Sequence, residues 1–379
     1  MKIGLISFHS FFQPGGVKRH ILGLYEEFKK RGIETKIIAP RRKIKEYYGK
    51  NIILLGTSFP LPFSGGVSDL GINFNPFAIE DVLKKERFDV LHFHNFGLPS
   101  TLQILASPSA AKTLNILTFH ANIKGSKILK RFPFFLYFLE RVVQWKIDGI
   151  IGVAPLNLKP FKKYHGLKIV IPNGIDLEKF NPKIPKIKRL LDGKINILFL
   201  GRIEKRKGLI YLLRVFKILQ KKFSNLRLIV VGEGPLKDDL EDWVREKKLK
   251  EVLFEGQIDE EKVSLYYSTC DIFCSPAIFG ESFGLVLVEA MACGKPVIAF
   301  ANEGYKGVLK GKGARFLVKP RDYKTLTKKL EILIKNEKLR KEMGEWGINE
   351  SQKYSWQKVA NQVLEFYKFC RQQKKIKVS

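Results

Sequence analysis

Cysteine, long apolar runs and acidic residues are scarce in this chain of 379 residues, and each scarcity excludes a class of protein. The four cysteines form no paired framework, and no second Cys or His pair stands near Cys270 and Cys274 to complete a zinc site. The longest apolar run, FPFFLYFL at 132–139, is too short for a membrane-spanning helix of about 20 residues. The N-terminal segment suits a first strand and turn better than a signal peptide. We therefore expect a cytoplasmic protein with reduced thiols.

The charge balance is strongly one-sided. Lys and Arg number 68 against 37 Asp and Glu, which gives a formal net charge of +31. Such a charge attracts nucleic acid, anionic lipid surfaces or phosphorylated ligands. Nucleic acid is disfavoured, because the sequence has no zinc-finger spacing, no RNP-like aromatic motif and no single basic helix. Since the lysines are spread along the chain, a compositional bias on a solvated surface explains the charge equally well.

Short, almost continuously apolar runs alternate with helix-like segments, which is typical of parallel strands covered on both faces. The first group of runs lies at 3–8, 35–40, 89–94, 115–120, 149–154 and 168–172. A second group lies at 195–201, 227–234, 252–257, 271–277, 296–300 and 314–318. Between the groups, 180–194 is basic, contains two prolines and lacks a strand pattern, as a linker does. The pattern predicts two Rossmann-like α/β halves.

The domain boundaries follow from this pattern. We expect an N-terminal domain at 1–185, a C-terminal domain at 186–353, and a closing segment at 354–379. The closing segment has apolar residues at helical spacing and a basic tail, so it predicts a helix that crosses back to the N-terminal domain. Ligands bind at the carboxyl ends of parallel strands, and the polar and glycine-rich motifs of both halves fall there.

Two motifs of the second half suit a phosphorylated sugar. GRIEKRKG at 201–208 places Arg202 and Lys207 between a strand and a helix, where they suit a diphosphate, although a solvated basic loop is the alternative. ESFGLVLVEAMACGKPVIA begins with a helix start whose free amides suit phosphate. Glu281 precedes that start and can accept hydrogen bonds from sugar hydroxyls. Glu289 lies among apolar residues, needs polar partners and suits ribose hydroxyls, although two acids near a helix N-terminus are also favourable for the helix itself.

Glycines and histidines follow strands of the first half. Gly15 and Gly16 in PGGV allow backbone amides to approach a ligand at a helix start, although a tight turn explains them too. Four histidines stand at strand ends: His9, His92, His94 and His120. A polar loop follows His120, where the ring suits a sugar hydroxyl or carbonyl. His92 and His94 alternate along one strand and are expected to point to opposite faces, so we predict no metal site.

Taken in order, PNGID (172–176), GRIEKRKG and GEGP, with the E-x7-E pattern from Glu281 to Glu289, resemble the retaining family 4 glycosyltransferases of the GT-B fold. The likeness spans essentially the whole chain. SFHSFFQPGGVKRHILGL and NEGYKGVLKGKGARFLVKP are most similar to bacterial phosphatidylinositol mannosyltransferases. The resemblance implies two Rossmann-like domains facing a cleft. It also implies hexose transfer, mannose favoured, from a nucleotide sugar to a lipid or phospholipid-headgroup acceptor; GDP-mannose is the favoured donor, with UDP and ADP sugars open.

The resemblance also implies roles for individual residues. Donor binding falls to Gly15, Gly16, Arg202, Lys207, Glu281, Phe283, Gly284, Leu285, Val286 and Glu289. Catalysis falls to His120 beside the transferred sugar, and to Glu281, Arg202 and Lys207. Such enzymes need no metal or other cofactor in the active site, since cations and helix ends stabilise the leaving group. A front-face attack assisted by the leaving phosphate needs no protein nucleophile.

The first loop departs from the phosphatidylinositol enzymes. They carry a Tyr and an acid around the inositol, where this chain has His9 and Gln13. Together with Lys18 and Arg19, these residues are the candidates for acceptor binding, and the added cations suit a phosphate-bearing headgroup. A soluble sugar or polysaccharide precursor is the alternative acceptor. A nucleotide-sugar epimerase or a phosphorylase is the alternative reaction on the same fold.

Two segments of the first half suit an anionic membrane surface, because they combine cations with apolar residues. The cations are Lys84, Lys85 and Arg87 in the first segment, and Lys124, Lys127, Lys130 and Arg131 in the second. A core helix with a basic rim is the alternative for each. We expect peripheral attachment to the inner face of the cell membrane. The sequence does not indicate an oligomeric state.

Overall fold

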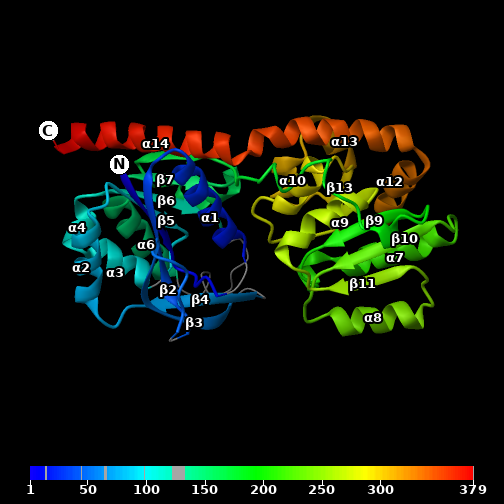
Figure 1. Ribbon diagram of the computed structural model, residues 1–379, viewed down its shortest axis with the longest axis horizontal. Helices are drawn as coiled ribbons and strands as arrows, with labels where there is room; N and C mark the ends of the chain where they lie inside the picture. Colours follow the sequence, from blue (N-terminus) through cyan, green and yellow to red (C-terminus); the bar gives the residue numbers. More distant parts are fainter. Residues whose placement is uncertain (13–14, 44, 64–65, 98, 122–132, 379) are drawn as a thin grey trace. The chain divides into compact units, whose positions relative to one another are not determined.

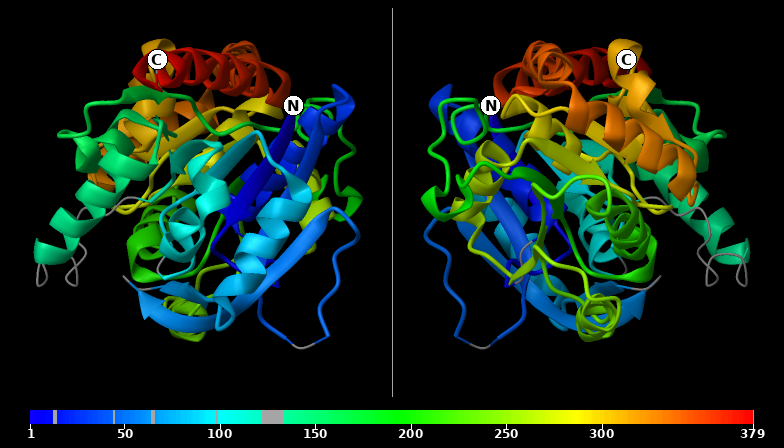
Figure 2. Two further views of the ribbon diagram at one scale, coloured as in Figure 1. Left: turned by 90° about the vertical axis from the view of Figure 1, so that its left-hand side faces the viewer. Right: turned by 90° about the vertical axis from the view of Figure 1, so that its right-hand side faces the viewer.

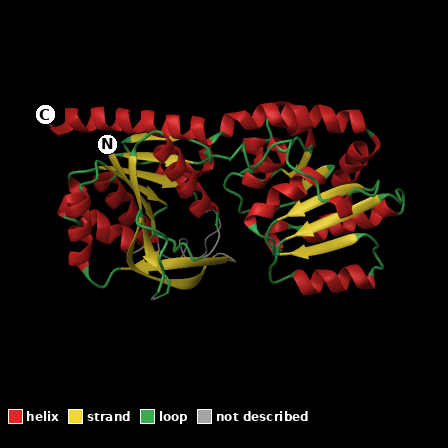
Figure 3. Ribbon diagram, in the orientation of Figure 1, coloured by secondary structure: helices red, strands yellow, loops and turns green. Residues whose placement is uncertain are grey.

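A computed structural model describes the chain except for residues 13–14, 44, 64–65, 98, 122–132 and 379 (Figure 1). The chain forms two compact units, one of Met1–Gly174 with Trp356–Ser379 and one of Ile175–Ser355. In each unit, helices lie on both sides of the strands of a central sheet (Figure 3). Two Rossmann-like units are therefore present, as the sequence predicts.

The first unit has eight strands in its described part, in the order β4-β3-β2-β1-β5-β6-β7-β8. They are β1 (Lys2–Ser7), β2 (Glu34–Arg41), β3 (Ile52–Phe63), β4 (Gly66–Ile72), β5 (Val90–His94), β6 (Leu114–Phe119), β7 (Gly149–Gly152) and β8 (Leu167–Val170). β3 and β4 form an antiparallel hairpin that the sequence analysis does not anticipate. β2 pairs with β3 only as far as Thr57, so Pro60 lies where β3 has a single neighbour and proline is tolerated.

Helices cover both faces of the first sheet (Figures 1 and 2). They are α1 (Gly16–Lys30), α2 (Pro76–Glu86), α3 (Ser100–Ala106), α4 (Pro108–Ala111), α6 (Pro133–Lys146), the 3-10 helix η1 (Pro155–Phe161) and α14 (Trp356–Val378). Side chains alternate along a strand, so Ile3 and Leu5 pack with α1 and α14, whereas Ile6 packs with α2 and its neighbours. The closing helix α14 therefore belongs to the core of the first unit.

The second unit has six parallel strands in the order β11-β10-β9-β12-β13-β14, all of them described. They are β9 (Ile195–Leu200), β10 (Leu226–Val231), β11 (Val252–Gly256), β12 (Ile272–Ser275), β13 (Val297–Phe300) and β14 (Leu317–Val318). The last strand is shorter than the predicted 314–318, because the preceding residues form the 3-10 helix η5 (Gly311–Phe316).

The helices of the second unit follow the predicted alternation. They are α7 (Leu209–Gln220), α8 (Lys237–Glu246), α9 (Val263–Thr269), α10 (Leu285–Ala292), α11 (Tyr305–Val308), α12 (Tyr323–Lys335) and α13 (Glu337–Ser351), with 3-10 helices η2 (Lys188–Leu190), η3 (Lys205–Lys207), η4 (Glu260–Lys262) and η6 (Gln352–Tyr354). In α7, Leu209, Leu212, Leu213 and Phe216 recur at helical spacing and are buried against the sheet. This packing fixes the loop that precedes α7, which carries Arg202 and Lys207.

Candidate active site

The second sheet reverses its winding between β9 and β12. From β9 the strand order runs to β10 and β11 on one side and to β12, β13 and β14 on the other. In such sheets the ligand lies at the carboxyl ends of the strands beside this switch point. Arg202 and Lys207 follow β9, and Glu281 follows β12. The topology therefore brings these predicted residues to one place.

The loops after β9 and β12 are in backbone contact. Gly208 has a φ of +70°, and a β-carbon there would lie 2.2 Å from the carbonyl oxygen of Pro276, so only glycine fits. The amide of Ile278 donates to the carbonyl of Arg206 at 2.8 Å. These contacts hold the basic turn η3 beside the segment that precedes α10.

Glu281 contacts two cations of that basic turn. Its Oε1 atom lies 2.7 Å from Lys207 Nζ and 2.9 Å from Arg206 Nη1. Burial raises the pKa of Glu281, but the charges and hydrogen bonds of Lys207 and Arg206 lower this pKa by more, so the net shift is downward. The carboxylate is ionised and held in one orientation, and it can accept hydrogen bonds from ligand hydroxyls.

Arg202 is the more open cation of the same loop. Its side chain is 50% exposed, and its Nε lies 3.9 Å from Glu204. Glu204 also contacts Nε of Arg206 at 2.6 Å. Sequence reasoning identified Arg202 and Lys207 but missed Arg206 and Glu204, which extend the charge cluster to Glu281. The run of three cations in η3 was the available signal.

The start of α10 is built around a glycine. Gly284 has a φ of +110°, and a β-carbon there would lie 2.7 Å from the Tyr305 ring. Phe283 is buried and its ring packs edge-on against Tyr354, with centroids 5.4 Å apart. In the described structure no side chain caps this helix end. The backbone donors around Leu285 and Val286 therefore lie at a helix start that suits an anion.

Glu289 lies inside the second unit. It is 2% exposed, and Tyr267 donates its hydroxyl hydrogen to Oε2 at 2.8 Å. This contact confirms that a carboxylate in apolar surroundings has a polar partner. Binding of ribose by Glu289 stays a prediction.

Gly15 and Gly16 stand at the corresponding switch point of the first sheet, after β1. α1 begins at Gly16, and both glycines are exposed. A β-carbon at either position would meet no described atom within 4 Å, and neither residue has a positive φ that requires glycine. Contacts with the described residues therefore do not require glycine at either position. Binding of the donor diphosphate by these glycines stays a prediction.

His9 contacts an acid that comes from the hairpin strand β4. Its Nδ1 lies 3.7 Å from Oδ2 of Asp69, and this oxygen accepts a hydrogen bond from the Ser10 amide at 2.7 Å. Arg42 contacts the other oxygen of Asp69. Burial raises the pKa of Asp69, but the His9 and Ser10 hydrogen bonds and the Arg42 charge lower it by more. Sequence reasoning missed Asp69, because the hairpin was not predicted, and it missed Arg42, which directly follows β2.

The other acceptor candidates differ in their surroundings. Lys18 donates its ammonium to the carbonyl of Phe11 at 2.7 Å, which ties α1 to the first loop. The amide of Arg19 donates to the carbonyl of Gly15 at 3.0 Å. Gln13 lies outside the described residues.

Histidine rings gather near the ends of β5 and β6. His94 and His120 have ring centroids 5.5 Å apart, and His20 of α1 lies 5.3 and 4.7 Å from them. Sequence reasoning missed His20, although it shares a helical stripe with the buried residues Leu24 and Phe28. Burial lowers the pKa of His20 to about 4 and the pKa values of His94 and His120 well below the usual range. All three rings are therefore neutral at pH 7.

The prediction that His92 and His94 point to opposite faces is wrong. Residues two apart on a strand lie on the same face, and these rings have centroids 4.3 Å apart. His92 Nε2 lies 2.6 Å from Thr118 Oγ1, and its Nδ1 lies 2.6 Å from the Tyr367 hydroxyl of α14. The stated reason against a histidine metal site therefore fails.

His120 is held through its backbone. Its amide donates to Oδ1 of Asn95 at 2.6 Å, and the amide of Ala121 donates to the same oxygen at 3.2 Å. Asn95 has a φ of +65°, a conformation that residues other than glycine and asparagine seldom adopt. Strain of this kind is typical of positions that place a functional side chain.

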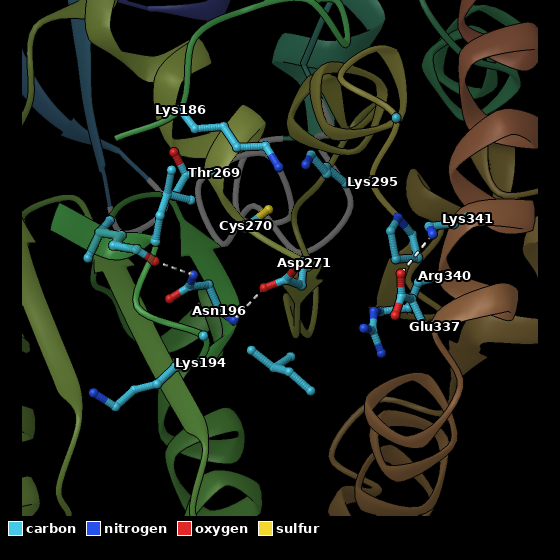
Figure 4. Close-up of a pocket in the computed structure, with 16 residues that line it drawn as sticks. Lys186, Lys194, Asn196, Thr269, Cys270, Asp271, Lys295, Glu337, Arg340 and Lys341 are labelled. Atoms are coloured by element: carbon cyan, nitrogen blue, oxygen red, sulfur yellow. Dashed lines mark hydrogen bonds and ion pairs between the residues drawn. The ribbon is translucent and has the colours of Figure 1, made fainter. Parts of the chain in front are cut away.

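A hollow of about 530 Å³ lies at the opposite, amino-terminal edge of the second sheet (Figure 4). Its lining includes several cations, but Lys194 and Lys341 have carboxylate partners. Lys295 and Arg340 donate to backbone carbonyls. Since ligands of parallel sheets bind at the carboxyl ends, this hollow is not the expected donor site.

The membrane candidates divide into described and undescribed residues. Lys84, Lys85 and Arg87 are exposed at the end of α2. The predicted cations Lys124, Lys127, Lys130 and Arg131 lie outside the described residues. No helix in the described part of the chain is long and apolar enough to span a bilayer.

The helix α6 carries an exposed aromatic stripe. Tyr137 and Trp145 are 53% and 76% exposed. The guanidinium of Arg141 lies 5.7 and 5.9 Å from their ring centroids. Aromatic rings beside a cation suit the interface between lipid headgroups and water.

The chain has two Rossmann-like units, the architecture of the GT-B fold, and comparison with known proteins shows that its class is that of the glycosyltransferases. The cluster of Arg202, Arg206, Lys207 and Glu281 is the candidate donor site. The chain belongs to glycosyltransferase family 4. Residues 14–179 match the family description Glycosyltransferase Family 4, and residues 180–350 match Glycosyl transferases group 1. This confirms the resemblance, the fold and the activity class that the sequence indicates.

Individual relatives support the same assignment. The chain is 33% identical to the phosphatidyl-myo-inositol mannosyltransferase of Mycobacterium leprae, over 97% of this chain and 96% of the relative. It is 28% identical to the alpha-monoglucosyldiacylglycerol synthase of Streptococcus pneumoniae, over 80% of this chain and 71% of the relative. The structure of sucrose-phosphate synthase from Thermosynechococcus elongatus matches with a TM-score of 0.75 and 21% identity, over 97% of this chain and 98% of the other, which shows a shared fold.

Proposed function

We propose that this glycosyltransferase moves mannose from GDP-mannose to a phospholipid headgroup at the inner face of the cell membrane, with retention of anomeric configuration. A UDP sugar is the alternative donor. The observation that carries the proposal is the contact of Glu281 with Lys207 and Arg206 beside the start of α10. The printed names of relatives, which include a phosphatidyl-myo-inositol mannosyltransferase and a glucosyldiacylglycerol synthase, support a lipid acceptor.

The described contacts support a separate role in donor binding for each residue of the donor site. Glu281 holds hydroxyls of the transferred sugar, because its carboxylate is ionised and fixed by two cations. Arg202, the half-exposed cation, reaches the diphosphate together with the amides at the start of α10. The positive charge of Lys207 balances the negative charges of Glu281 and of the diphosphate. The leaving diphosphate is then stabilised by protein cations and helix amides, and the proposal includes no metal or other cofactor in the transfer step.

The first loop is the proposed acceptor site. His9, Asp69 and Arg42 form a charged cluster, and Lys18 of α1 is hydrogen-bonded to the same loop through the Phe11 carbonyl. Asp69 offers an ionised carboxylate to acceptor hydroxyls, while Arg42, Lys18 and the neighbouring cations suit a headgroup phosphate. The sequence of the first loop has no acidic residue, and Asp69 of β4 supplies one.

Two surfaces of the first unit support the proposed peripheral attachment to the membrane. The cations at the end of α2 attract anionic lipid, and the stripe of Tyr137, Arg141 and Trp145 on α6 supplies aromatic rings for the interface.

The donor is tested by thermal unfolding with GDP, UDP and ADP sugars, since a ligand of the folded state raises its stability. We expect GDP-mannose to give the largest rise. Transfer is then measured from the selected donor to vesicles that contain phosphatidylinositol or diacylglycerol, and to free inositol and mannose in solution. Product on phosphatidylinositol alone, with the donor's anomeric configuration by NMR, supports the proposal. Transfer only to soluble sugars would overturn the lipid acceptor, and an inverted anomer would overturn retention.

A further inference from the structure

The first unit contains a cluster of three buried histidines from three elements. His20 comes from α1, His94 ends β5, and His120 follows β6. One ring nitrogen of each lies within 4.8 Å of the others. Their side chains are almost fully buried, with 3%, 0% and 9% exposed respectively. Buried imidazoles so close together need partners for their nitrogens, because polar atoms in a protein interior are normally hydrogen-bonded.

The described residues do not supply all of these partners. Nδ1 of His94 and Nε2 of His120 lie 3.2 Å apart and share one hydrogen. Nδ1 of His20 and Nε2 of His94 are buried and have no hydrogen-bond partner in the described part of the chain. Oδ1 of Asn173 lies close enough to His20 and His120 to favour their protonated forms, yet among the described residues it also has no partner of hydrogen-bond geometry. The unpartnered nitrogen of His20 and the unpartnered oxygen of Asn173 therefore suit a ligand beside the His94 and His120 contact.

The chemistry of the cluster selects the kind of ligand. Neutral imidazoles offer lone pairs to a metal without first losing a proton. Two nitrogens bound to one tetrahedral zinc ion at about 2.0–2.1 Å lie about 3.3 Å apart, close to the 3.2 Å between His94 and His120. Three imidazoles without a carboxylate favour zinc, cobalt, nickel or copper over magnesium or calcium.

His92 is not a fourth ligand, although its ring is next to His94. Both of its nitrogens already have partners, Thr118 and Tyr367. The backbone of His120 is independently fixed by Asn95. Among the described residues the set is therefore the three histidines, as in sites that leave a coordination position open.

We infer that His20, His94 and His120 bind one divalent transition-metal ion, and that this ion inhibits sugar transfer. The inhibition rests on the proposed function, in which His120 lies beside the transferred sugar. A metal on His120 occupies the nitrogen lone pair and holds the ring within the cluster. That nitrogen is then unavailable to the sugar, whereas the donor residues of the second unit keep their contacts.

Metal binding is tested on the full-length protein after treatment with a chelator and its removal. Co²⁺ is titrated in, and the visible absorption of tetrahedral Co²⁺ is followed, with Zn²⁺ as competitor. We expect one ion per chain and at least a tenfold weaker Kd in His20→Gln and in His94→Gln. His165→Gln is the matched control, because His165 is exposed and outside the cluster. Normal thermal unfolding and normal nucleotide binding show that each variant is folded.

Three outcomes of the titration overturn the site: no Co²⁺ spectrum, a spectrum that His20→Gln and His94→Gln both retain, or one that His165→Gln removes. The inhibition is measured separately, as transfer activity against free Zn²⁺. Its midpoint should match the Kd from the competition and move at least tenfold in His20→Gln. Binding without inhibition would overturn the regulatory part alone. If the protein transfers no sugar, the proposed function fails, and the Co²⁺ spectrum still decides the metal site.

Discussion

Lys207 Nζ lies 2.7 Å from Oε1 of Glu281, and this contact joins the loops that follow β9 and β12. Arg206 contacts the same oxygen at 2.9 Å. The two cations lower the pKa of Glu281 in spite of its burial. The carboxylate therefore has its charge and orientation before a ligand arrives, and such preorganised electrostatics are a main source of enzymatic rate acceleration.

Glu281→Gln should abolish most transfer while the protein stays folded. The amide keeps the shape of the side chain but removes the charge that Lys207 and Arg206 hold. We expect kcat to fall by about 100-fold or more, in the range found when one preorganised polar group of an active site is removed. Steady-state kinetics measure this. Glu331→Gln is the matched control, because Glu331 is paired with Lys222 and Lys335 away from the site and should retain activity. A Glu281→Gln enzyme within threefold of wild type would contradict the role.

Arg202→Ala should weaken binding of the nucleoside diphosphate itself. A hydrogen bond to a charged group contributes about 1.5–3 kcal/mol, which corresponds to a roughly 10- to 150-fold rise in Kd. Isothermal titration calorimetry with the diphosphate measures the change. Lys205→Ala controls for the loss of one charge in the same loop, since Lys205 is exposed in η3. Equal losses in the two variants would show that net charge, not the position of Arg202, sets the affinity.

Gly284→Ala should destabilise the protein, whereas Gly16→Ala should not. At Gly284 a β-carbon meets the Tyr305 ring at 2.7 Å and φ is +110°, so the free energy of unfolding should fall by about 1–3 kcal/mol. At Gly16 the β-carbon meets open space, so stability should hold or rise by up to about 1 kcal/mol. Because the family likeness places the diphosphate against the Gly16 amide, the methyl group of Gly16→Ala should hinder its approach and weaken nucleotide binding. Urea unfolding and calorimetry measure both effects; a Gly16→Ala protein with unaltered affinity removes that residue from the donor site.

Asp69 makes the stability of the first unit depend on pH. Its folded-state pKa is lowered from the unfolded value of about 3.9, because the His9 and Ser10 hydrogen bonds and the Arg42 charge outweigh burial. A lowered carboxyl pKa contributes stability above the unfolded pKa, and this contribution is lost as the pH falls through the folded value. Asp69→Asn should therefore unfold at a lower temperature than wild type at pH 7, and the difference should shrink below about pH 4. A gap that is the same at both pH values would contradict this.

Trp145→Ala should reduce binding to anionic vesicles. The exposed indole and Arg141 form one stripe of α6, and each apolar or cationic contact with the interface adds to attachment. Co-sedimentation with vesicles that contain phosphatidylserine measures binding, which should also weaken at high salt. Phe369→Ala is the matched control, as Phe369 is an exposed aromatic residue on α14. Salt-independent binding, or equal losses in both variants, would exclude the stripe as the contact surface.

Much of the fold can be predicted from the sequence, because strands and helices are specified by patterns of neighbouring residues. The apolar runs of β9 and β10 and the helical spacing in α7 predict a parallel sheet, and both glycine-rich loops lie at strand ends. The hairpin of β3 and β4 escapes this reasoning, since it depends on which strand lies at the edge. For the same reason the sequence analysis missed Asp69, which lies in this hairpin and whose partner His9 is far away in the sequence.

The candidate site divides in the same way. The basic turn η3 has three consecutive cations, Lys205 to Lys207. Successive side chains of a 3-10 helix project about 120° apart, so the three cations point in different directions. The fold directs Arg206 and Lys207 to Glu281 and leaves Lys205 exposed. That choice depends on the contact between the two loops at Gly208, which no local pattern records.

By itself, the sequence determined the two Rossmann-like halves, the family and the types of residue at the donor site, because periodicity and motifs are properties of neighbouring residues. Only the tertiary structure decided which charges meet. It paired Glu281 with Arg206 as well as Lys207, and it brought His20 to His94 and His120. The residues in these contacts come from distant segments of the chain. Strand order and helix packing bring them together, so the contacts form only when the sheets have formed.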